Sequence, residues 1–161
     1  DIQNYGVEET VTDITPAVPG GLFPSSVFQY NRDKWSSFST GQREALLRAA
    51  ATGAAAILTR YRSDLKEAQS LMAELGASFH QADDEVLEAT DAFIEQDIKD
   101  AADVYAQEHG NKNGEQILND FRQRLSKWRG LVQDVESEEA LAELYWKEIF
   151  SRVDPETYGV K

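Results

Sequence analysis

The apolar positions of this chain change their spacing near residue 39, and the change separates two kinds of expected element. Before it, Val11–Ile14 and Ser25–Tyr30 are short, rich in β-branched and aromatic residues, and separated by a Pro/Gly-rich turn, so they predict two strands. After it, apolar residues recur three and four positions apart, which is the spacing of one helix face. We therefore expect a strand and turn segment over residues 1–38 and a helical region over residues 39–161.

The first expected helix covers residues 39–75 and is unusually long. Its apolar stripe follows one face, and Gly76 supplies the stop. At 1.5 Å per residue it would be about 50 Å long, more than the usual helix of a small domain. We expect it either to brace two lobes or to bend midway. Two polar pairs can cap its start: Ser39 with Gln42, and Thr40 with Glu44.

Three more helices and a further short strand are expected downstream. Ala77–His80 can form the strand, and the next helix begins at Asp83 or Asp84 and ends at His109-Gly110. Another helix follows the turn at Asn111–Gly114, and the last begins after Ser137 and closes at Asp154-Pro155. Because a two-stranded ribbon alone is marginal in water, we expect the strands to pair with others from an upstream segment.

The composition of the chain argues against several classes of function. The chain has 161 residues, with 29 acidic and 16 basic side chains and a formal net charge of -13, which would repel nucleic acid and an anionic membrane surface. It has no cysteine, which excludes disulfides, thiolate nucleophiles and sulfur-ligated metals. Its longest apolar stretch, Ala49–Leu58, is shorter than the roughly 20 residues of a spanning helix. The start at Asp1, without a targeting segment, suggests a processed or truncated product.

The residues that carry catalytic or metal chemistry do not form a convincing site. His80 lies near Asp83 and Asp84, but paired aspartates before an apolar-periodic segment are more typical of a helix start than of a metal cluster. The run from His109 to Gly114 lacks the first carboxylate and last glutamate of a calcium loop, so it predicts a turn. Nucleophile-elbow and phosphate-loop motifs are absent. We expect no catalytic residue, metal site or cofactor, and no enzymatic activity.

A series of short motifs gives the chain a family resemblance. Asn31-x-x-x-Trp35 leads to Phe38 and then to Gln42-Arg43 at the start of an alanine-rich helix, and a tail runs from Tyr145-Trp146 to Tyr158-Gly159. In this order the motifs resemble the solute-binding proteins of tripartite ATP-independent periplasmic (TRAP) transporters, of the DctP type. The resemblance covers residues 6–159.

The resemblance implies the C-terminal portion of a two-lobed α/β fold in the periplasm. Such a protein closes over an organic acid, a dicarboxylate or related carboxylate, and delivers it to membrane permease subunits. The long helix would brace both lobes, residues 1–38 would contribute to the cleft and lobe sheets, and an upstream N-terminal part of the same protein would complete them.

The resemblance also suggests ligand-contacting residues. Gly20, Gly21, Leu22 and Phe23 fall where family members place cleft-lining residues, with the glycines allowing close backbone approach and Phe23 forming an apolar wall. A plain strand-turn is the alternative. The arginine that holds the carboxylate in this family lies upstream of the matched region, so no arginine here takes that role. We expect this chain alone to bind weakly or not at all.

A second interpretation needs no upstream segment. The apolar stripe from Phe121 to Val135 is regular enough to dock a partner helix in a hydrophobic groove, as a self-contained helical protein–protein interaction module would.

Overall fold

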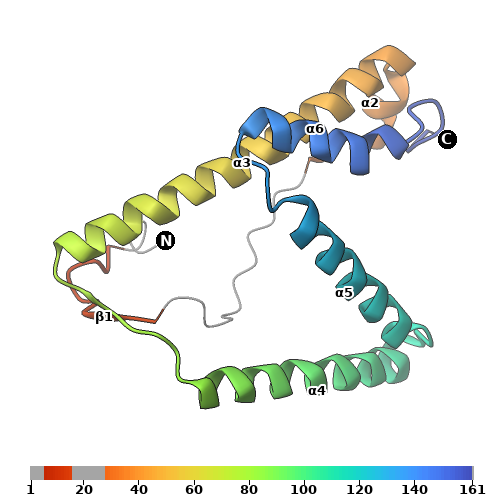
Figure 1. Cartoon of the computed structure of the whole chain (residues 1–161). Coiled ribbons are helices and arrows are strands. Elements are labelled where there is room, and N and C mark those ends of the chain that lie inside the picture. The colour runs from red at the N-terminus through yellow and green to blue at the C-terminus, as the bar shows by residue number, and fades with distance from the viewer. Residues whose placement is uncertain (1–5, 16–27, 161) are drawn as a thin grey trace. The chain divides into compact units, whose positions relative to one another are not determined.

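The computed structural model describes residues 6–15 and 28–160 and is mainly helical, as predicted (Figure 1). Two very short strands accompany the helices. In chain order the elements are β1 (Asp13–Ile14), α2 (Arg32–Ser37), α3 (Thr40–Glu74), β2 (Ser78–Phe79), α4 (Asp84–His109), α5 (Gly114–Leu131), α6 (Glu138–Glu148) and the 3-10 helix η1 (Phe150–Arg152).

Helix α3 forms where the sequence predicts it, and both of its ends are capped. At the start, the Ser39 backbone N–H donates to Gln42 Oε1 at 2.9 Å and the Gln42 N–H donates to Ser39 Oγ at 3.2 Å, a reciprocal capping box. At the end, Gly76 adopts a φ of 85°, and the Ala77 N–H reaches back to the Met72 carbonyl at 2.9 Å. These bonds satisfy backbone groups that a helix end otherwise leaves unpaired.

The chain divides into two compact units, each built from separate stretches. Unit 1 comprises Asp1–Leu22 and Leu71–Gln133, and unit 2 comprises Phe23–Ser70 and Asp134–Lys161. Among the described elements, α3 alone contributes residues to both units. The chain therefore passes between the units more than once, and one of those passages lies inside a continuous helix.

Unit 1 contains a parallel strand pair and a helical hairpin. In β1 and β2, Asp13 is opposite Ser78 and Ile14 is opposite Phe79, and backbone hydrogen bonds join the strands. Helices α4 and α5 pack closely where Gly114 meets Ala102, since a Cβ on Gly114 would lie 3.2 Å from the Ala102 Cα. Further along the hairpin, Arg122 pairs with Glu95. Ala102 is the one buried residue of the two helices.

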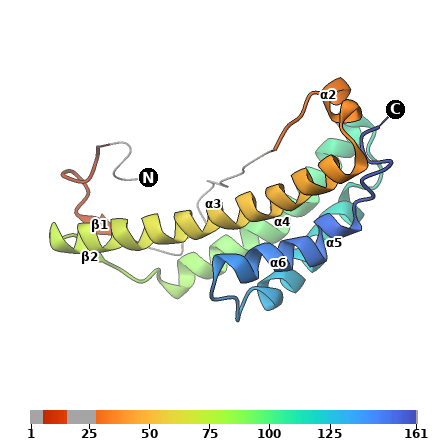
Figure 2. The same ribbon diagram turned by 90° about the horizontal axis from the view of Figure 1, so that it is seen from above.

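In unit 2, α6 contacts the first part of α3, and the C-terminal turn, residues 154–159, contacts α2 and the start of α3. Figures 1 and 2 both show α6 alongside α3. The buried residues of α3 here recur every fourth position: Arg43, Leu47, Ala51 and Ala55. Leu141 of α6 is also buried, and small alanines allow neighbouring backbones to approach closely.

Several sequence expectations need correction. The Ser25–Tyr30 strand is wrong over residues 28–30, where the Phe28 ring packs on Gly53 instead of pairing in a sheet, and residues 25–27 lie outside the described part. Helix α2 was not predicted. The last helix ends at Glu148 rather than Asp154, because Ile149 leaves the helical region (φ −127°, ψ −70°).

The strand pairing also differs from expectation. The strand predicted at Ala77–His80 is confirmed as β2, and β1 lies within the predicted Val11–Ile14. The two pair with each other in parallel, whereas we expected their partners to come from an upstream segment. A pair of two-residue strands is too small to be stable alone. The strand β2 follows directly after the hydrogen-bonded turn at Gly76 that ends α3.

The two ends of α3 allow a matched pair of glycine substitutions. Gly76→Ala forces an alanine into the left-handed region, so the free energy of unfolding should fall by roughly 1–2 kcal/mol. Gly41→Ala, with open space around its Cβ and helical backbone, should raise it by roughly 0.4–1 kcal/mol. Denaturant titrations followed by circular dichroism measure both. Equal effects of the two substitutions would show that the left-handed turn does not terminate α3.

Candidate ligand-binding hollow in unit 2

Unit 2 contains a hollow of about 720 Å³, within the size range of small-molecule sites. Its walls are mostly aromatic and aliphatic side chains, and among its described lining residues Arg32 carries the one charged group. The lining residues are Phe28, Gln29, Tyr30, Arg32, Trp35, Leu46, Leu47, Ala50, Phe150, Tyr158 and Gly159.

Helix α2 carries both the cation Arg32 and the buried aromatic residue Trp35. Asn31 caps this helix, and its Oδ1 accepts hydrogen bonds from the Asp33 N–H at 3.0 Å and the Lys34 N–H at 3.1 Å. Arg32 therefore occupies the first turn, and Trp35 follows one turn later on the same helix. The Tyr30 ring lies 5.7 Å from the Trp35 ring, centre to centre.

The C-terminal turn forms another wall through direct contact with Trp35. The indole Nε1–H donates to the Tyr158 carbonyl at 2.7 Å, and the two rings meet edge to face at 6.3 Å. Gly159 follows with a φ of 68°, and a Cβ there would lie 3.2 Å from the indole ring. Glycine is thus required both by the backbone conformation and by the space beside Trp35.

Arg43 contacts the same turn, and no carboxylate of the described residues lies at hydrogen-bond distance from its guanidinium. It is 7% exposed, and its Nε donates to the Pro155 carbonyl at 2.6 Å while Nη1 donates to the Phe38 carbonyl at 2.9 Å. A buried guanidinium must be hydrogen-bonded. By donating to the Pro155 carbonyl, Arg43 joins the C-terminal turn to the start of α3. Arg43 is therefore a structural residue.

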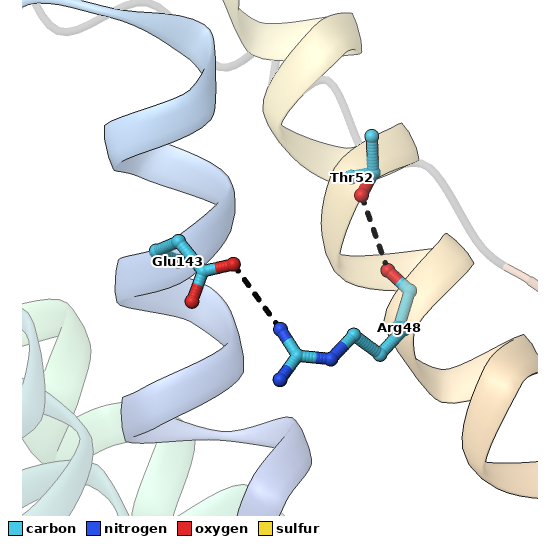
Figure 3. A network of polar contacts seen from close by, with 3 residues as sticks. All are labelled: Arg48, Thr52 and Glu143. Atoms are coloured by element: carbon cyan, nitrogen blue, oxygen red, sulfur yellow. Dashed lines mark hydrogen bonds and ion pairs between the residues drawn. The ribbon is translucent and has the colours of Figure 1, made fainter.

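Arg48 is also occupied by contacts within the chain. Its Nη1 lies 3.1 Å from Glu143 Oε1, and its guanidinium is 3.9 Å from the centre of the Trp146 ring. Figure 3 shows the bond to Glu143 together with the hydrogen bond from the Thr52 hydroxyl to the Arg48 carbonyl. This pair joins α3 to α6 at an exposed position.

Asp154 organises the backbone of the C-terminal turn. The Thr157 hydroxyl donates to Oδ2 at 2.7 Å and the Glu156 N–H donates to Oδ1 at 2.9 Å. These two bonds, in that order of importance, lower the pKa of Asp154, and the charge of Arg43 adds a smaller effect in the same direction. The ionised carboxylate therefore stabilises the turn that presents Tyr158 to Trp35.

The residues that sequence analysis singled out fall elsewhere. Gly20–Phe23, the expected cleft residues, lie outside the described part of the chain. His80 bonds Asp13 across the strand pair, Nε2 to Oδ1 at 2.7 Å, and this bond is the main reason that the pKa of Asp13 is lowered. Within residues 6–15 and 28–160 no cluster of metal-ligating side chains occurs. The predicted turn after α4 is confirmed, with Gly110 in the left-handed region.

Sequence analysis missed the hollow because its walls come from distant stretches. The local signal was the aromatic series Phe28, Tyr30, Trp35 and Phe38, which we interpreted as a strand leading to a family motif. Nothing local could show that Tyr158, 123 residues beyond Trp35, would close the other side.

Comparison of the chain with protein-family models, curated proteins and solved structures found no match. In the part of the chain that the structure describes, no helix combines the length and apolarity that crossing a membrane requires.

The buried arginine gives a direct test of what holds the C-terminal turn. Arg43→Gln removes donors from two carbonyls, so the free energy of unfolding of unit 2 should fall by roughly 1–3 kcal/mol. Arg60→Gln, which removes an exposed pair with Asp64, should cost about 0.5 kcal/mol or less. Denaturant titration compares them. Similar losses for both variants would contradict the structural role of Arg43.

The turn should also respond to acid. Because the pKa of Asp154 is lower in the folded chain than in the unfolded chain, its contribution is present above the ordinary aspartate pKa and is lost as the pH falls through the folded value. We expect the Trp35 indole N–H resonance to move below about pH 4. In Asp154→Asn this acid transition should be absent. An unchanged transition in that variant would assign it to another group.

Proposed function

We propose that the chain belongs to an extracytoplasmic solute-binding component of a TRAP transporter, which captures an organic acid in the periplasm and delivers it to membrane permease subunits. The observation that supports this most is α3, a 35-residue helix that contributes to two compact units, each assembled from separate stretches of chain. This is what the family resemblance implies for the long helix after Asn31-x-x-x-Trp35.

The chain arrangement suits a protein that closes around a ligand. Hinge closure requires compact bodies that are connected by a few segments, so that the bodies stay joined while they move. Repeated passage of the chain between the two units supplies such segments. An organic acid of dicarboxylate or related type is the proposed cargo, and binding rather than catalysis is the proposed activity.

The residues proposed for ligand contact are of two kinds. Gly20–Phe23 remain the candidates from the family resemblance. The hollow beside Trp35 adds an apolar wall with Arg32 at its side. Arg43 and Arg48 are held by contacts within unit 2, which fits the expectation that neither is the carboxylate-anchoring arginine of the family.

A helical interaction module is the second candidate, and one observation favours it. The α4–α5 hairpin leaves large apolar side chains exposed, including Phe93 at 67% and Phe121 at 58%. Surfaces of this kind mark interaction sites when they are contiguous. The first candidate also accounts for them if these faces pack on other parts of the solute-binding protein.

Transport measured with purified components tests the first candidate. The full protein is added to vesicles that contain the permease subunits encoded beside its gene, and uptake of a radiolabelled organic acid is followed. We expect uptake to require the protein and to saturate with its concentration. The control is the same vesicle with an unrelated solute-binding protein.

Other results would favour the interaction module. A gene without permease neighbours, together with concentration-dependent self-association of the chain in analytical ultracentrifugation that Phe121→Ser abolishes, would overturn the transport proposal.

A further inference from the structure

Among the arginines near the hollow, Arg32 differs in that its side chain has no partner in the part of the chain that the structure describes. Arg43 donates to two backbone carbonyls, and Arg48 is held between Glu143 and Trp146. In residues 6–15 and 28–160 no hydrogen bond, ion pair or ring contact involves the side chain of Arg32, which is exposed on α2 and lines the hollow. Its guanidinium is therefore available to an anionic ligand, and it presents a planar fork of donors that matches a carboxylate.

The other described lining residues provide no second positive charge that could pair with another carboxylate. The indole N–H of Trp35 is already used by the Tyr158 carbonyl, and most other described walls are aromatic or aliphatic. Besides the Arg32 guanidinium and the Trp35 indole, the polar side-chain groups among the described lining residues are the Gln29 amide and the hydroxyls of Tyr30 and Tyr158, none of which carries a positive charge. A second carboxylate would have to lose hydration against these walls without a cation to compensate it, which is costly. An aromatic or aliphatic body, in contrast, would bury apolar surface against Phe28, Tyr30 and Trp35.

From these contacts we propose that the hollow of unit 2 binds an organic acid with one carboxylate and an apolar, preferably aromatic, body. Arg32 is then the ionic contact, in place of the upstream arginine that the family resemblance implies. The inference rests on the proposed function and narrows its cargo from dicarboxylates and related carboxylates to monocarboxylates with an apolar body. The hollow, at about 720 Å³, leaves room for a ring and a short aliphatic linker.

Three probe molecules separate the contributions of charge and apolar body. Isothermal titration calorimetry of the full chain compares 3-phenylpropanoate, its neutral amide 3-phenylpropanamide, and the dicarboxylate glutarate. Because a hydrogen bond to a charged group contributes about 1.5–3 kcal/mol, we expect 3-phenylpropanoate to bind at least about tenfold more tightly than either comparison ligand.

Two matched variants locate the effect. Arg32→Gln should reduce the affinity for 3-phenylpropanoate to that for the amide and leave the affinity for the amide unchanged. Arg62→Gln, an exposed arginine of α3 that does not line the hollow, should leave both affinities unchanged. Circular dichroism confirms that each variant is folded before titration.

Each remaining outcome overturns the inference and leaves the proposed function to be judged separately. If glutarate binds as tightly as 3-phenylpropanoate, or if Arg32→Gln leaves the affinity for 3-phenylpropanoate unchanged, the proposal of a single-carboxylate site is wrong. The proposal of an organic-acid cargo is not contradicted by either result. If none of the three probes binds, the hollow is not a ligand site. The uptake experiment with the full protein then decides the transport function independently.

Discussion

The structure depends on α3 remaining a single helix over 35 residues, which at 1.5 Å per residue corresponds to about 52 Å. Two backbone devices define its length: the capping box at Ser39 and Gln42, and the left-handed turn at Gly76. Its middle carries Gly53, which alone would weaken a helix by roughly 1 kcal/mol. The Phe28 ring packs where a Cβ would lie, so this glycine serves close packing within unit 2.

A second constraint, the burial of Arg43, connects this helix to the candidate site. A guanidinium that is 7% exposed must find acceptors, and it finds them in the Phe38 and Pro155 carbonyls. The turn that begins at Asp154 is thereby fixed beside α2, where Tyr158 can accept the Trp35 indole hydrogen bond. The walls of the hollow therefore depend on a polar contact that is itself outside it.

Local signals in the sequence predicted the elements better than the site. The cap at Ser39 and the stop at Gly76 are encoded by neighbouring residues, so the bounds of α3 were predicted to within a residue. Burial depends on which elements cover each face, and that information is non-local: Trp35 meets Tyr158 across 123 residues. The candidate residues Gly20–Phe23 were proposed from family resemblance, and their role stays a prediction because they lie outside the described part.

The continuity of α3 across the two units is the claim on which the transport proposal most depends, and distance measurement by pulsed electron paramagnetic resonance tests it directly. The chain has no cysteine, so Ala49→Cys and Ala73→Cys introduce unique, exposed sites for spin labels in unit 2 and unit 1. A continuous helix places these positions about 36 Å apart along its axis, and we expect one narrow distribution near that distance. A broad distribution, or a maximum clearly shorter than this, would show that α3 bends or breaks between the units and would contradict its bracing role.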